Sequence, residues 1–584
     1  MAARLLRHRS ARRGERGGRA TGRRWRSSAI FQHHNLPGTI LDRQTHFGAT
    51  RITLHMLLLL LLLLSAPASN SEDAFASSAA IRAAIARPDA LPAAAQDMVA
   101  RLYEAEGYRP LWSGGDGRHA RQALQLLQEA HAHGLEPSAY RLAAVPGQPD
   151  DPAAHGAAVD VALSGAVLQL LSHLHFGRAP PEPAALPAAE QGPDYDPVEQ
   201  LRRALVQDGV AQLANDAAPR VALYWRVKKT LAEYRTLASL AGQWPPISAL
   251  PHGGKLIVGR PYAGIPPVRQ RLILLGDLPG ADAAADDAVY SAALAQAIRR
   301  FQSRHGLDAN GELGASTMAA LAVSPAHRVR QLILTLERLR WLPAVRRGRI
   351  VAVNIPAFRL WAFDSAHPGQ AEPLEMRVIV GAAARTPTPL FVGQMRYLEF
   401  NPYWNVPRSI ERKEILPRLA RDPAYLKNNA MELVSAGGKI LAAGTADSMA
   451  ALRAGTARVR QRPGPRNVLG AVKFAMPNPM NIYLHATSAR ELFDKERRDL
   501  SHGCIRVERP AELAEFVLAD TAQWDSESVR EAMQPGPTRT VRLGSAVPVV
   551  LFYATAVTDR RGRPLFANDI YRLDQALARA LHMQ

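Results

Sequence analysis

The chain has 584 residues, of which 47% are hydrophobic and one is a cysteine. A chain of this length is expected to fold into about two to four domains rather than around one core. A single cysteine excludes an intramolecular disulfide framework. The net charge of +20 is uneven, because residues 1–55 carry twelve arginines against two carboxylates, which is half of the excess. The remaining +10 over the rest of the chain does not predict a nucleic-acid partner.

A secretory signal is predicted at the end of this basic leader. Leu57–Leu64 is an unbroken leucine run, and Ser65-Ala-Pro-Ala68 offers a small-residue cleavage site. A basic flank, a short apolar stretch and such a site are the three parts of a signal peptide. We expect residues 1–68 to be removed. The alternative is an uncleaved N-terminal anchor, through which alone the chain would contact the membrane. A true start codon further downstream would explain the long leader. The rest of the chain is expected in the periplasm or cell envelope.

Residues 71–250 are predicted to form a helical scaffold. Apolar residues recur at three and four spacing, for example at Ala123, Leu124 and Leu127 and again from Val161 to Leu174. Gly134, Gly177 and Gly242, each soon followed by a proline, are typical helix stops. The proline-rich stretch 180–193 is an internal linker. The pattern indicates packing residues here and no chemistry.

A second, smaller helical unit is predicted at residues 265–325. Leu294, Ala297, Ile298 and Phe301 form a one-faced stripe, and a turn at 308–311 precedes a short helix at 316–321. The segments "ALAQAIRRFQSRHGL" and "DANGELGASTMAAL" resemble the small three-helix peptidoglycan-binding module of many wall enzymes. That resemblance implies glycan strands as partners. A structural spacer without glycan affinity is the alternative.

From residue 328 to 556 the pattern changes to a β-rich domain. Short β-branched or aromatic runs alternate with turn residues, at 350–355, 358–363, 376–380, 395–400 and 472–474. Helices are expected at Pro510–Leu518 and at Ala567–Leu581. The second lies in a C-terminal helix and tail, residues 557–584. Residues 409–460 interrupt the strands with a helical, charged pattern. An excursion of this length is too long for a turn and is typical of a segment that covers a site.

The only cysteine, Cys504, lies in the sequence Ser501-His502-Gly503-Cys504. Exported proteins pair their cysteines or avoid them, so this unpaired thiol is interpreted as a nucleophile that needs a base. Two histidines are within reach, His502 and His485. A buried inert thiol is one alternative. A zinc site from these three residues is another, although no Cys-x-x-Cys pair supports it.

His485, followed by fifteen residues and then by Ser-His-Gly-Cys, an aliphatic residue and Arg506, resembles the signature of the L,D-transpeptidases, the YkuD-type cysteine enzymes of peptidoglycan. The segments "LGAVKFAMPNPMNIYLHATSARELF", "FNPYWNVPRSI" and "RPGPRNVLG" resemble the large subgroup of that family. The resemblance implies an α+β multidomain protein. Its parts are a helical scaffold, a three-helix peptidoglycan-binding module and a β-rich catalytic domain with a helical capping insertion.

The resemblance also implies roles for individual residues. Cys504 would be the acyl-accepting nucleophile and His485 its general base, oriented by the carbonyl of Ala486, where many relatives have Asp or Gly. His502, Gly503 and the Cys504 amide would stabilise the oxyanion. Arg506 would bind a substrate carboxylate or brace the loop. Tyr483 and Trp404 would line the acceptor groove or belong to the core. Thr386-Pro-Thr-Pro389 is expected to be loop architecture only.

The implied reaction is attack of Cys504 on the third residue of a tetrapeptide stem, with loss of D-alanine. A neighbouring stem's amine would then give a 3→3 crosslink, water would give L,D-carboxypeptidase action, and a protein or free D-amino acid would give tethering or exchange. The family leads us to expect carbapenem inhibitors, no cofactor and no metal. A non-catalytic wall-binding protein is a rival, but both His485 and Cys504 are intact. Papain-like and NlpC/P60-type peptidases place the cysteine before the histidine, the reverse of this order.

Overall fold

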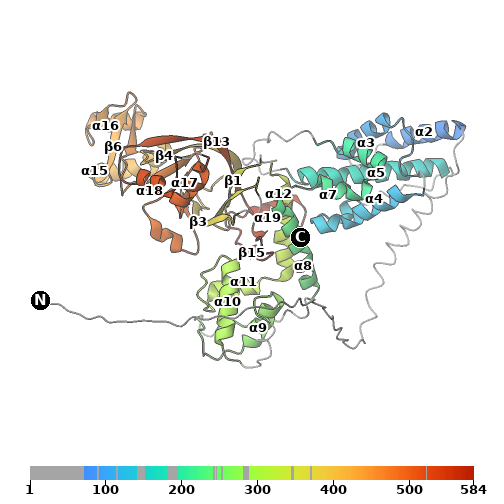
Figure 1. The fold of residues 1–584 in the computed structure, drawn as a ribbon, viewed down its shortest axis with the longest axis horizontal. Helices are drawn as coiled ribbons and strands as arrows, with labels where there is room; N and C mark the ends of the chain where they lie inside the picture. Colours follow the sequence, from blue (N-terminus) through green and yellow to red (C-terminus); the bar gives the residue numbers. More distant parts are fainter. Residues whose placement is uncertain are drawn as a thin grey trace, which may run out of the picture. The chain divides into compact units, whose positions relative to one another are not determined.

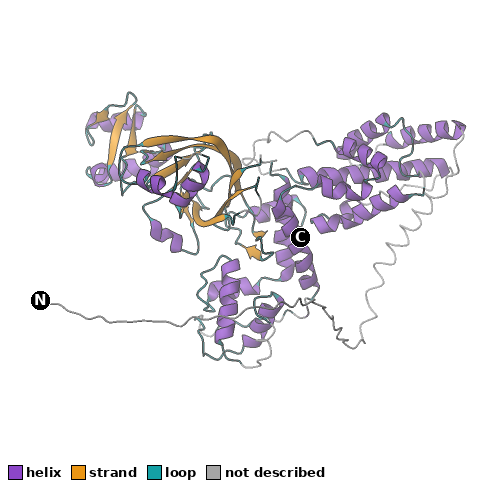
Figure 2. Cartoon of the chain, in the orientation of Figure 1, coloured by secondary structure: helices purple, strands orange, loops and turns teal. Residues whose placement is uncertain are grey.

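The computed structural model describes residues 71–583 except for short gaps. These are 88–90, 92, 114–115, 141, 143–151, 181–194, 241, 243, 245, 251–253, 280–287, 344–346, 368–370 and 521–522. The basic leader, the leucine run and the predicted cleavage site lie outside the described residues. Helices form the chain up to residue 340, and the strands of the large sheet begin at residue 349 (Figures 1 and 2). The predicted change from helical to β-rich structure is confirmed.

The N-terminal region is helical, as its apolar spacing predicts. Ala120, Ala123, Leu124 and Leu127 are the buried face of one helix, which is the pattern of an amphipathic helix packed on a core. Its helices are α2 Ser71–Ile85, α3 Ala93–Ala105, α4 Arg118–Glu129, α5 Pro152–Phe176, α6 Pro197–Gln207, α7 Leu213–Ala217 and α8 Ala222–Ser239, with short 3-10 turns at Ala130–His133, Pro137–Tyr140 and Val210–Gln212. Two of the three predicted glycine stops follow helix ends, whereas α8 ends at Ser239, ahead of Gly242.

Helix α5 is the centre of this region. Its Asp160 accepts hydrogen bonds from the Tyr103 hydroxyl at 2.5 Å and from the Trp112 N–H at 2.9 Å, and its Ser164 accepts the Trp112 indole N–H at 2.8 Å. Buried polar groups are stable only when they are paired in this way. By length and composition α5 could cross a membrane, but 78% of its apolar window is buried inside the protein, as in a core helix.

The second helical unit contains three helices around one small core, as predicted. They are α9 Ile265–Leu274, α10 Ala292–Arg304 and α11 Ala315–Ala322. The predicted stripe of α10 is buried. The Gln302 side chain holds the turn at 308–311, because it accepts the Gly311 N–H at 2.8 Å and donates to the Glu312 carbonyl at 2.9 Å. Helix α12, Pro325–Arg340, follows and packs against α8.

The β-rich domain is built on a nine-stranded sheet in the order β11-β3-β12-β10-β9-β4-β13-β1-β2. Strand β2 also pairs with β3, so eight of these strands form a closed ring with β11 added to β3, and closure leaves few free edges. The bounds are β1 Arg349–Asn354, β2 Arg359–Asp364, β3 Leu374–Gly381, β4 Phe391–Phe400, β9 Val472–Ala475, β10 Leu484–His485, β11 Asp499–Ser501, β12 Ile505–Val507 and β13 Arg539–Phe552.

The interior of this sheet is an apolar core. Val353, Val378, Leu398, Phe474 and Val549, each from a different strand, are fully buried. Burying one such side chain stabilises the fold by about 1.5–3 kcal/mol. The helices of this domain are α17 Pro510–Leu518, which the sequence predicts at the same residues, and α18 Ser526–Ala532. A 3-10 turn, η8 Arg490–Asp494, lies between β10 and β11.

The insertion between β4 and β9 forms a cap, residues 404–466, with its own core and more than the predicted helices. Its helices are α13 Arg408–Ile410, the π-helical turn η7 Glu411–Ile415, α14 Leu416–Arg421, α15 Tyr425–Asn428 and α16 Ala446–Ala454. A four-stranded sheet joins β5 Trp404–Asn405, β8 Ala457–Gln461, β6 Met431–Ser435 and β7 Ile440–Leu441. The helical pattern expected over residues 409–460 is wrong at its end, because Val459 lies on β8 and its N–H donates to the buried carboxylate of Glu411 at 2.6 Å.

The last residues also belong to the folded structure. β14 Ala556–Thr558 pairs with β15 Pro564–Phe566, and α19 Leu573–Ala580 follows. The Thr558 hydroxyl bonds Thr230 of α8 at 2.9 Å, and Asp574 of α19 accepts from Arg338 of α12 at 2.5 Å. These residues therefore anchor to the helices that precede the sheet.

We expect the cap to be removable. Its two ends meet, since the Asn467 amide donates to the Pro402 carbonyl at 2.9 Å. Replacing residues 404–466 by a short Gly-Ser linker should lower Tm by less than about 4 °C, roughly 1 kcal/mol, as measured by circular dichroism melting. The matched control deletes residues 556–566, whose Ala556 and Phe566 are buried against α8 and α12, and should unfold the protein. Loss of cooperative melting in the cap deletion would contradict an independent cap.

Candidate active site

Strands β10 and β12 bring four of the predicted site residues together. They run parallel, with Leu484 opposite Ile505 and His485 opposite Arg506. Neighbouring strands lie about 4.8 Å apart, and alternate side chains share a face. Tyr483 directly precedes β10, and its carbonyl accepts the Ile505 N–H at 3.1 Å, which continues the pairing by one residue. Cys504, the last residue of the turn before β12, is thus placed beside Tyr483, on the same side of the sheet as His485 and Arg506, and the four residues form one patch.

The turn before β12, residues 501–504, is closed by its own serine. The Ser501 hydroxyl donates to the Cys504 carbonyl at 2.6 Å and accepts the Gly503 N–H at 3.1 Å. Gly503 has a φ of +118°, which a side-chain-bearing residue adopts only with strain. Ser501 and Gly503 are thus required by the geometry of the turn, which holds Cys504 at the start of β12.

The Cys504 thiol is partly buried and uncharged at rest. Its sulfur donates to the Asn481 carbonyl at 3.6 Å. Burial raises the pKa of Cys504 above its ordinary value, while hydrogen bonds from Tyr483 and the charges of Lys473 and Arg506 lower it. Because the thiolate is the nucleophilic form, a base has to remove the proton during any reaction.

His485 is suited to be that base. The ring is 5% exposed, and burial, followed by the charge of Arg506, lowers its pKa to about 3. Nδ1–H donates to the Ala486 carbonyl at 2.6 Å, and this carbonyl and that of Leu469 act in the opposite direction. The imidazole is therefore neutral at pH 7, and the carbonyls favour the charged form that appears when it accepts a proton. Alanine at 486 keeps the carbonyl available.

Tyr483 and Trp404 extend this patch toward the cap. Cys504 and Trp404 both act on the pKa of the Tyr483 hydroxyl, and the Tyr483 ring lies 5.7 Å from that of His485. Burial, followed by the neighbouring Cys504, raises the pKa of Tyr483. Trp404 lies on β5, paired with Gln461 of the cap, and packs against the cap core. Tyr483 thus neighbours the thiol, and Trp404 is the cap residue that faces Tyr483.

Two cations flank the thiol and the imidazole, and the sequence reading missed one. Lys473 on β9 lies opposite His485, with Nζ 2.7 Å from Glu399 and 5.0 Å from the Tyr483 ring centroid. The alternation Val472-Lys473-Phe474, with both apolar residues buried, is the signal that could have found it. Arg506 differs from Lys473, because its buried Nε meets no acceptor among the described residues.

His502 lies apart from the patch. Its side chain is 51% exposed, and Nε2 lies 2.6 Å from Oε1 of Glu414 in η7. The prediction that groups it with the oxyanion donors remains untested, but in this structure the imidazole joins the Ser-His-Gly-Cys turn to the cap. A histidine two residues before the thiol would share its face on a strand, yet residues 502–504 lie in the turn between β11 and β12.

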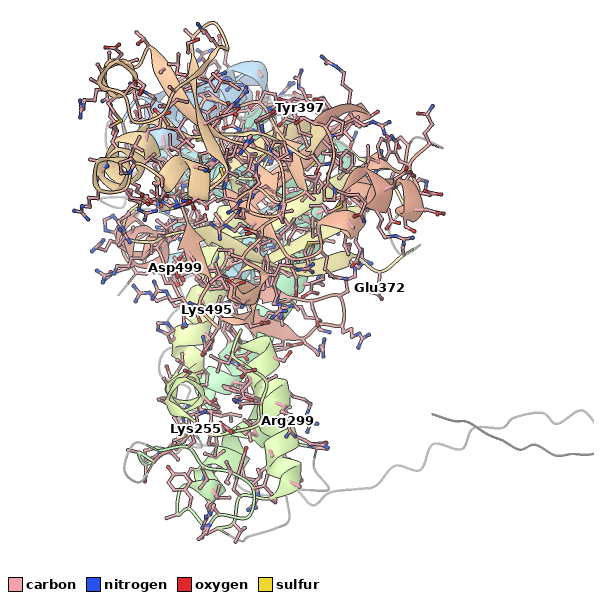
Figure 3. The ribbon with its side chains drawn as sticks, turned by 90° about the vertical axis from the view of Figure 1, so that its left-hand side faces the viewer. Lys255, Arg299, Glu372, Tyr397, Lys495 and Asp499 are labelled. Carbon is pink, nitrogen blue, oxygen red and sulfur yellow. The ribbon has the colours of Figure 1, made fainter. Side chains whose placement is uncertain are left out.

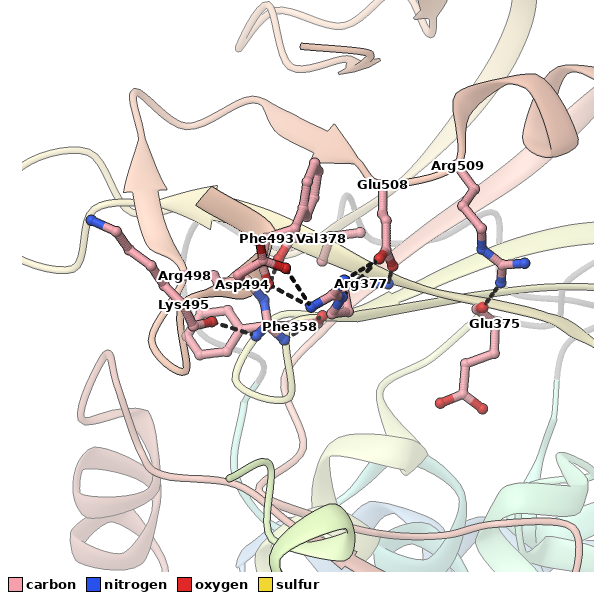
Figure 4. A network of polar contacts seen from close by, with 10 residues as sticks. All are labelled: Phe358, Glu375, Arg377, Val378, Phe493, Asp494, Lys495, Arg498, Glu508 and Arg509. Atoms are coloured by element: carbon pink, nitrogen blue, oxygen red, sulfur yellow. Dashed lines mark hydrogen bonds and ion pairs between the residues drawn. The ribbon is translucent and has the colours of Figure 1, made fainter. Parts of the chain in front are cut away.

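An arginine network fixes the segment 486–500 that returns from His485 to the turn (Figure 4). Arg377 on β3 bonds Glu508 with Nε at 2.8 Å and the Phe493 carbonyl with Nη1 at 2.9 Å. Arg498 donates to the Lys495 carbonyl at 2.7 Å and lies over the Phe358 ring. Figure 3 labels Lys495 and Asp499 of this segment. Planar guanidinium groups suit such rigid bracing. The two arginines therefore fix the segment that joins His485 to the turn with Cys504.

Within the described part of the chain, no group of three or more His, Cys, Asp or Glu side chains is placed to hold a metal ion. Of the three residues of the zinc alternative, His502 pairs with Glu414 and His485 with a backbone carbonyl. The arrangement is that of a thiol, a neutral base and two cations, which can form and break an acyl bond.

Two solved structures to which the chain is similar are distant from it in sequence. An L,D-transpeptidase of Xylanimonas cellulosilytica is 16% identical, covers 53% of this chain and all of its own, and has a TM-score of 0.16. A fused Zn-dependent amidase/peptidase/peptidoglycan-binding domain-containing protein of Clostridium acetobutylicum is 11% identical, covers 51% of this chain and all of its own, and has a TM-score of 0.13. These TM-scores carry no argument about the fold.

Family models match most of the described chain. The model described as "L,D-transpeptidase catalytic domain" matches residues 348–547, the "Scaffold domain" 97–231 and the "Putative peptidoglycan binding domain" 264–321. A protein of Haemophilus influenzae named "Putative L,D-transpeptidase" is 32% identical over 247 residues, 42% of this chain and 48% of that protein. The chain thus spans about half the length of this relative. Together these matches show that the chain contains a YkuD-type L,D-transpeptidase catalytic domain, with a scaffold domain and a peptidoglycan-binding domain ahead of it.

Proposed function

We propose that this protein is an exported peptidoglycan L,D-transpeptidase that forms 3→3 crosslinks through an acyl-enzyme on Cys504. One observation carries the proposal: the only cysteine of the chain shares a sheet face with a buried, neutral imidazole. A thiol and a base in this arrangement are the components of covalent acyl transfer. The family match and the peptidoglycan-binding domain support peptidoglycan as the substrate and the cell envelope as the location.

The first half-reaction transfers the stem to the enzyme. The Cys504 sulfur attacks the carbonyl carbon of the third stem residue while His485 takes the thiol proton. The carbonyl oxygen becomes an oxyanion, for which the Cys504 N–H is the proposed donor. When the carbon–nitrogen bond breaks, His485 returns the proton to the leaving amine of D-alanine. A thioester on Cys504 remains, and the charges of Lys473 and Arg506 favour the sulfur anion during these steps.

The second half-reaction decides the product. The side-chain amine of the third residue of another stem attacks the thioester and gives a proton to His485. His485 passes this proton to the leaving sulfur as the carbon–sulfur bond breaks, which gives the 3→3 crosslink. Water at the same step gives a tripeptide, the L,D-carboxypeptidase alternative. We favour the amine because the cap lies over the catalytic turn through Glu414 and Trp404, and cover of this kind excludes water.

Arg506 is the proposed site for a substrate carboxylate. It lies on the same sheet face as the thiol, and its Nε is buried without an acceptor among the described residues. A buried polar group without a partner costs stability, and a carboxylate is the ligand that a guanidinium prefers. This favours substrate binding over the bracing role that the sequence left open.

The charge of the cap supports an anionic substrate. Residues 404–466 hold twelve Lys or Arg and five Asp or Glu, a net charge of +7. Several of these cations are exposed, among them Arg412, Lys413 and Arg458. A concentration of one charge beside a site raises the local concentration of oppositely charged ligands, and stem peptides carry free carboxylates. The cap deletion described above should therefore turn over stems poorly.

We expect Cys504 to be essential for product formation. Full-length protein incubated with disaccharide tetrapeptide should release D-alanine and form crosslinked dimer in excess over tripeptide at high acceptor concentration, as measured by liquid chromatography and mass spectrometry. The C504A variant should release none, because no other thiol exists in the chain. Tripeptide as the sole product would contradict the transpeptidase assignment in favour of the carboxypeptidase. D-alanine release by C504A would sink the nucleophile itself.

The cation Lys473 should tune the thiol. Lys473→Met removes a positive charge that lowers the pKa of Cys504, so the pKa should rise and alkylation by iodoacetamide at a fixed pH of about 8 should slow. Cys504 is the only thiol, which makes the loss of free thiol a clean measure. The control Lys255→Met removes another lysine paired with a glutamate, 2.8 Å from Glu312, and should leave the titration unchanged. An equal rate of alkylation in the Lys473→Met and Lys255→Met variants would refute the electrostatic role.

Loss of the Arg506 guanidinium should weaken stem binding. Arg506→Met is expected to raise KM for the tetrapeptide about tenfold, since a hydrogen bond to a charged group contributes about 1.5–3 kcal/mol. It should also lower kcat, because the charge of Arg506 favours the sulfur anion. Arg226→Met, which removes a partly buried arginine bonded to the Thr558 carbonyl, is the control. If the two variants have the same KM as the unmodified protein, Arg506 braces the loop.

A further inference from the structure

The C-terminal segment reaches the loop that holds the catalytic turn. Tyr571 lies between β15 and α19, beyond the end of the transpeptidase match at residue 547. Its hydroxyl donates to the Gly381 carbonyl at 2.6 Å and accepts the Thr388 N–H at 3.1 Å. One phenol thus joins the end of β3 to the Thr386-Pro-Thr-Pro389 loop, which the sequence alone assigns only to loop architecture.

Thr388 continues the chain of hydrogen bonds to the turn. Its hydroxyl accepts the Gly381 N–H at 2.8 Å and donates to the Gly503 carbonyl at 2.7 Å. The side chain is 2% exposed, so water does not compete for these bonds. A hydroxyl has one proton, and the carbonyl of Gly503 is the acceptor that receives it. These bonds form a relay from Tyr571 through Gly381 and Thr388 to the Gly503 carbonyl, and the direction of each hydrogen bond in the relay is therefore fixed.

Holding this carbonyl also orients the thiol's own amide. The Gly503–Cys504 peptide unit is planar and trans, so its N–H points opposite to its carbonyl. Thr388 fixes the carbonyl on one side, and the Cys504 N–H is directed to the other. Among the described residues, this N–H meets no hydrogen-bond acceptor. It is left available for a ligand oxygen.

The contacts between this loop and the turn are too close to be incidental. A Cβ added to Gly381 would lie 2.0 Å from the Thr386 carbonyl oxygen, so only glycine fits. The Ser501 carbonyl accepts from the Thr386 hydroxyl at 3.1 Å and from the Ala382 N–H at 2.9 Å. Two carbonyls of the turn are therefore held from this loop, one by each threonine.

Tyr571 is itself held in place. Its ring is stacked on Tyr553, with centroids 5.9 Å apart, and its N–H donates to the Tyr553 hydroxyl at 3.0 Å. That hydroxyl donates to Asp569 at 2.6 Å. Asp569 accepts the N–H of Asp574 at 3.1 Å, and Asp574 in turn accepts from Arg338 of α12. The relay thus begins on a helix outside the β-rich domain.

We propose that Tyr571 and Thr388 are positioning residues that orient the Gly503–Cys504 peptide, so that the Cys504 N–H is directed at the oxyanion of the acylation step. The inference rests on the proposed acyl transfer to Cys504. It assigns to the segment after residue 547 a part in the chemistry, although neither side chain touches the thiol.

The test measures D-alanine release from disaccharide tetrapeptide by full-length variants. Tyr571→Phe keeps the ring and loses the hydroxyl, and Thr388→Val keeps the shape and loses both hydroxyl bonds. We expect each to lower kcat about tenfold or more with KM within about twofold, because donor alignment matters in the transition state and not in ground-state binding. Thr388→Ser, which retains the hydroxyl, should restore kcat to within about threefold. The rate of Cys504 alkylation by iodoacetamide, which forms no oxyanion, should be unchanged in all three.

The matched control is Tyr290→Phe in the peptidoglycan-binding domain, which also removes a buried tyrosine bond of 2.6 Å to a glycine carbonyl, that of Gly311. It should retain full kcat. If Tyr571→Phe and Thr388→Val match this control, the relay is overturned while the proposed function stands. If Thr388→Ser is as impaired as Thr388→Val, or alkylation falls with kcat, the contacts are merely structural and the proposal is overturned. Absence of D-alanine release from the unmodified protein overturns the proposed function and the relay together.

Discussion

The parallel pairing of β10 with β12 is the constraint on which the rest of the site depends. It sets His485 opposite Arg506 and aligns Tyr483 with Cys504, so that a base and a thiol separated by many residues share one face. The pairing is short, two residues on β10 and three on β12, and would be weak alone. Closure of the sheet through β2 and β3 supports it, and the bonds of Arg377 and Arg498 hold the segment between the two strands.

Burial sets the protonation of this patch at rest. It keeps the Cys504 thiol protonated and, together with the charges of Arg506 and Lys473, keeps the imidazole neutral, while the same two charges favour the thiolate. A low-dielectric site strengthens the effect of both cations when the sulfur becomes anionic during attack. The cap adds a basic surface over the turn, and the C-terminal segment adds the bonds that orient the Gly503 carbonyl. The site is therefore assembled from parts of the chain far apart in sequence.

Local signals in the sequence were sufficient for some of this structure. Apolar spacing located the stripe of α10 and five of the nine strands of the large sheet, and the His485 to Cys504 motif located the centre of the site. The alternation around Lys473 turns its side chain away from the core, but its place opposite His485 depends on the pairing of β9 with β10. The contributions of Thr388 and Tyr571 arise from long-range packing, which no local pattern encodes. The cap strands were missed because β6 and β8 are short and carry charged residues such as Glu432 and Arg460, which pair with each other across the sheet. The solvent-facing position of His502 depends on the cap residue Glu414 and could not be read from its own neighbours.

The central claim is that the stem's acyl group resides on Cys504 during turnover. Its most direct test is peptide mapping after rapid acid quench of the full-length protein with disaccharide tetrapeptide. Trypsin should release the peptide Asp499–Arg506, which contains the only cysteine. The account predicts that this peptide gains the mass of the stem acyl group without its terminal D-alanine, and that hydroxylamine removes the added mass, as it does from a thioester. An acyl group found on another peptide, or turnover with this peptide unmodified at every quench time, would contradict the account.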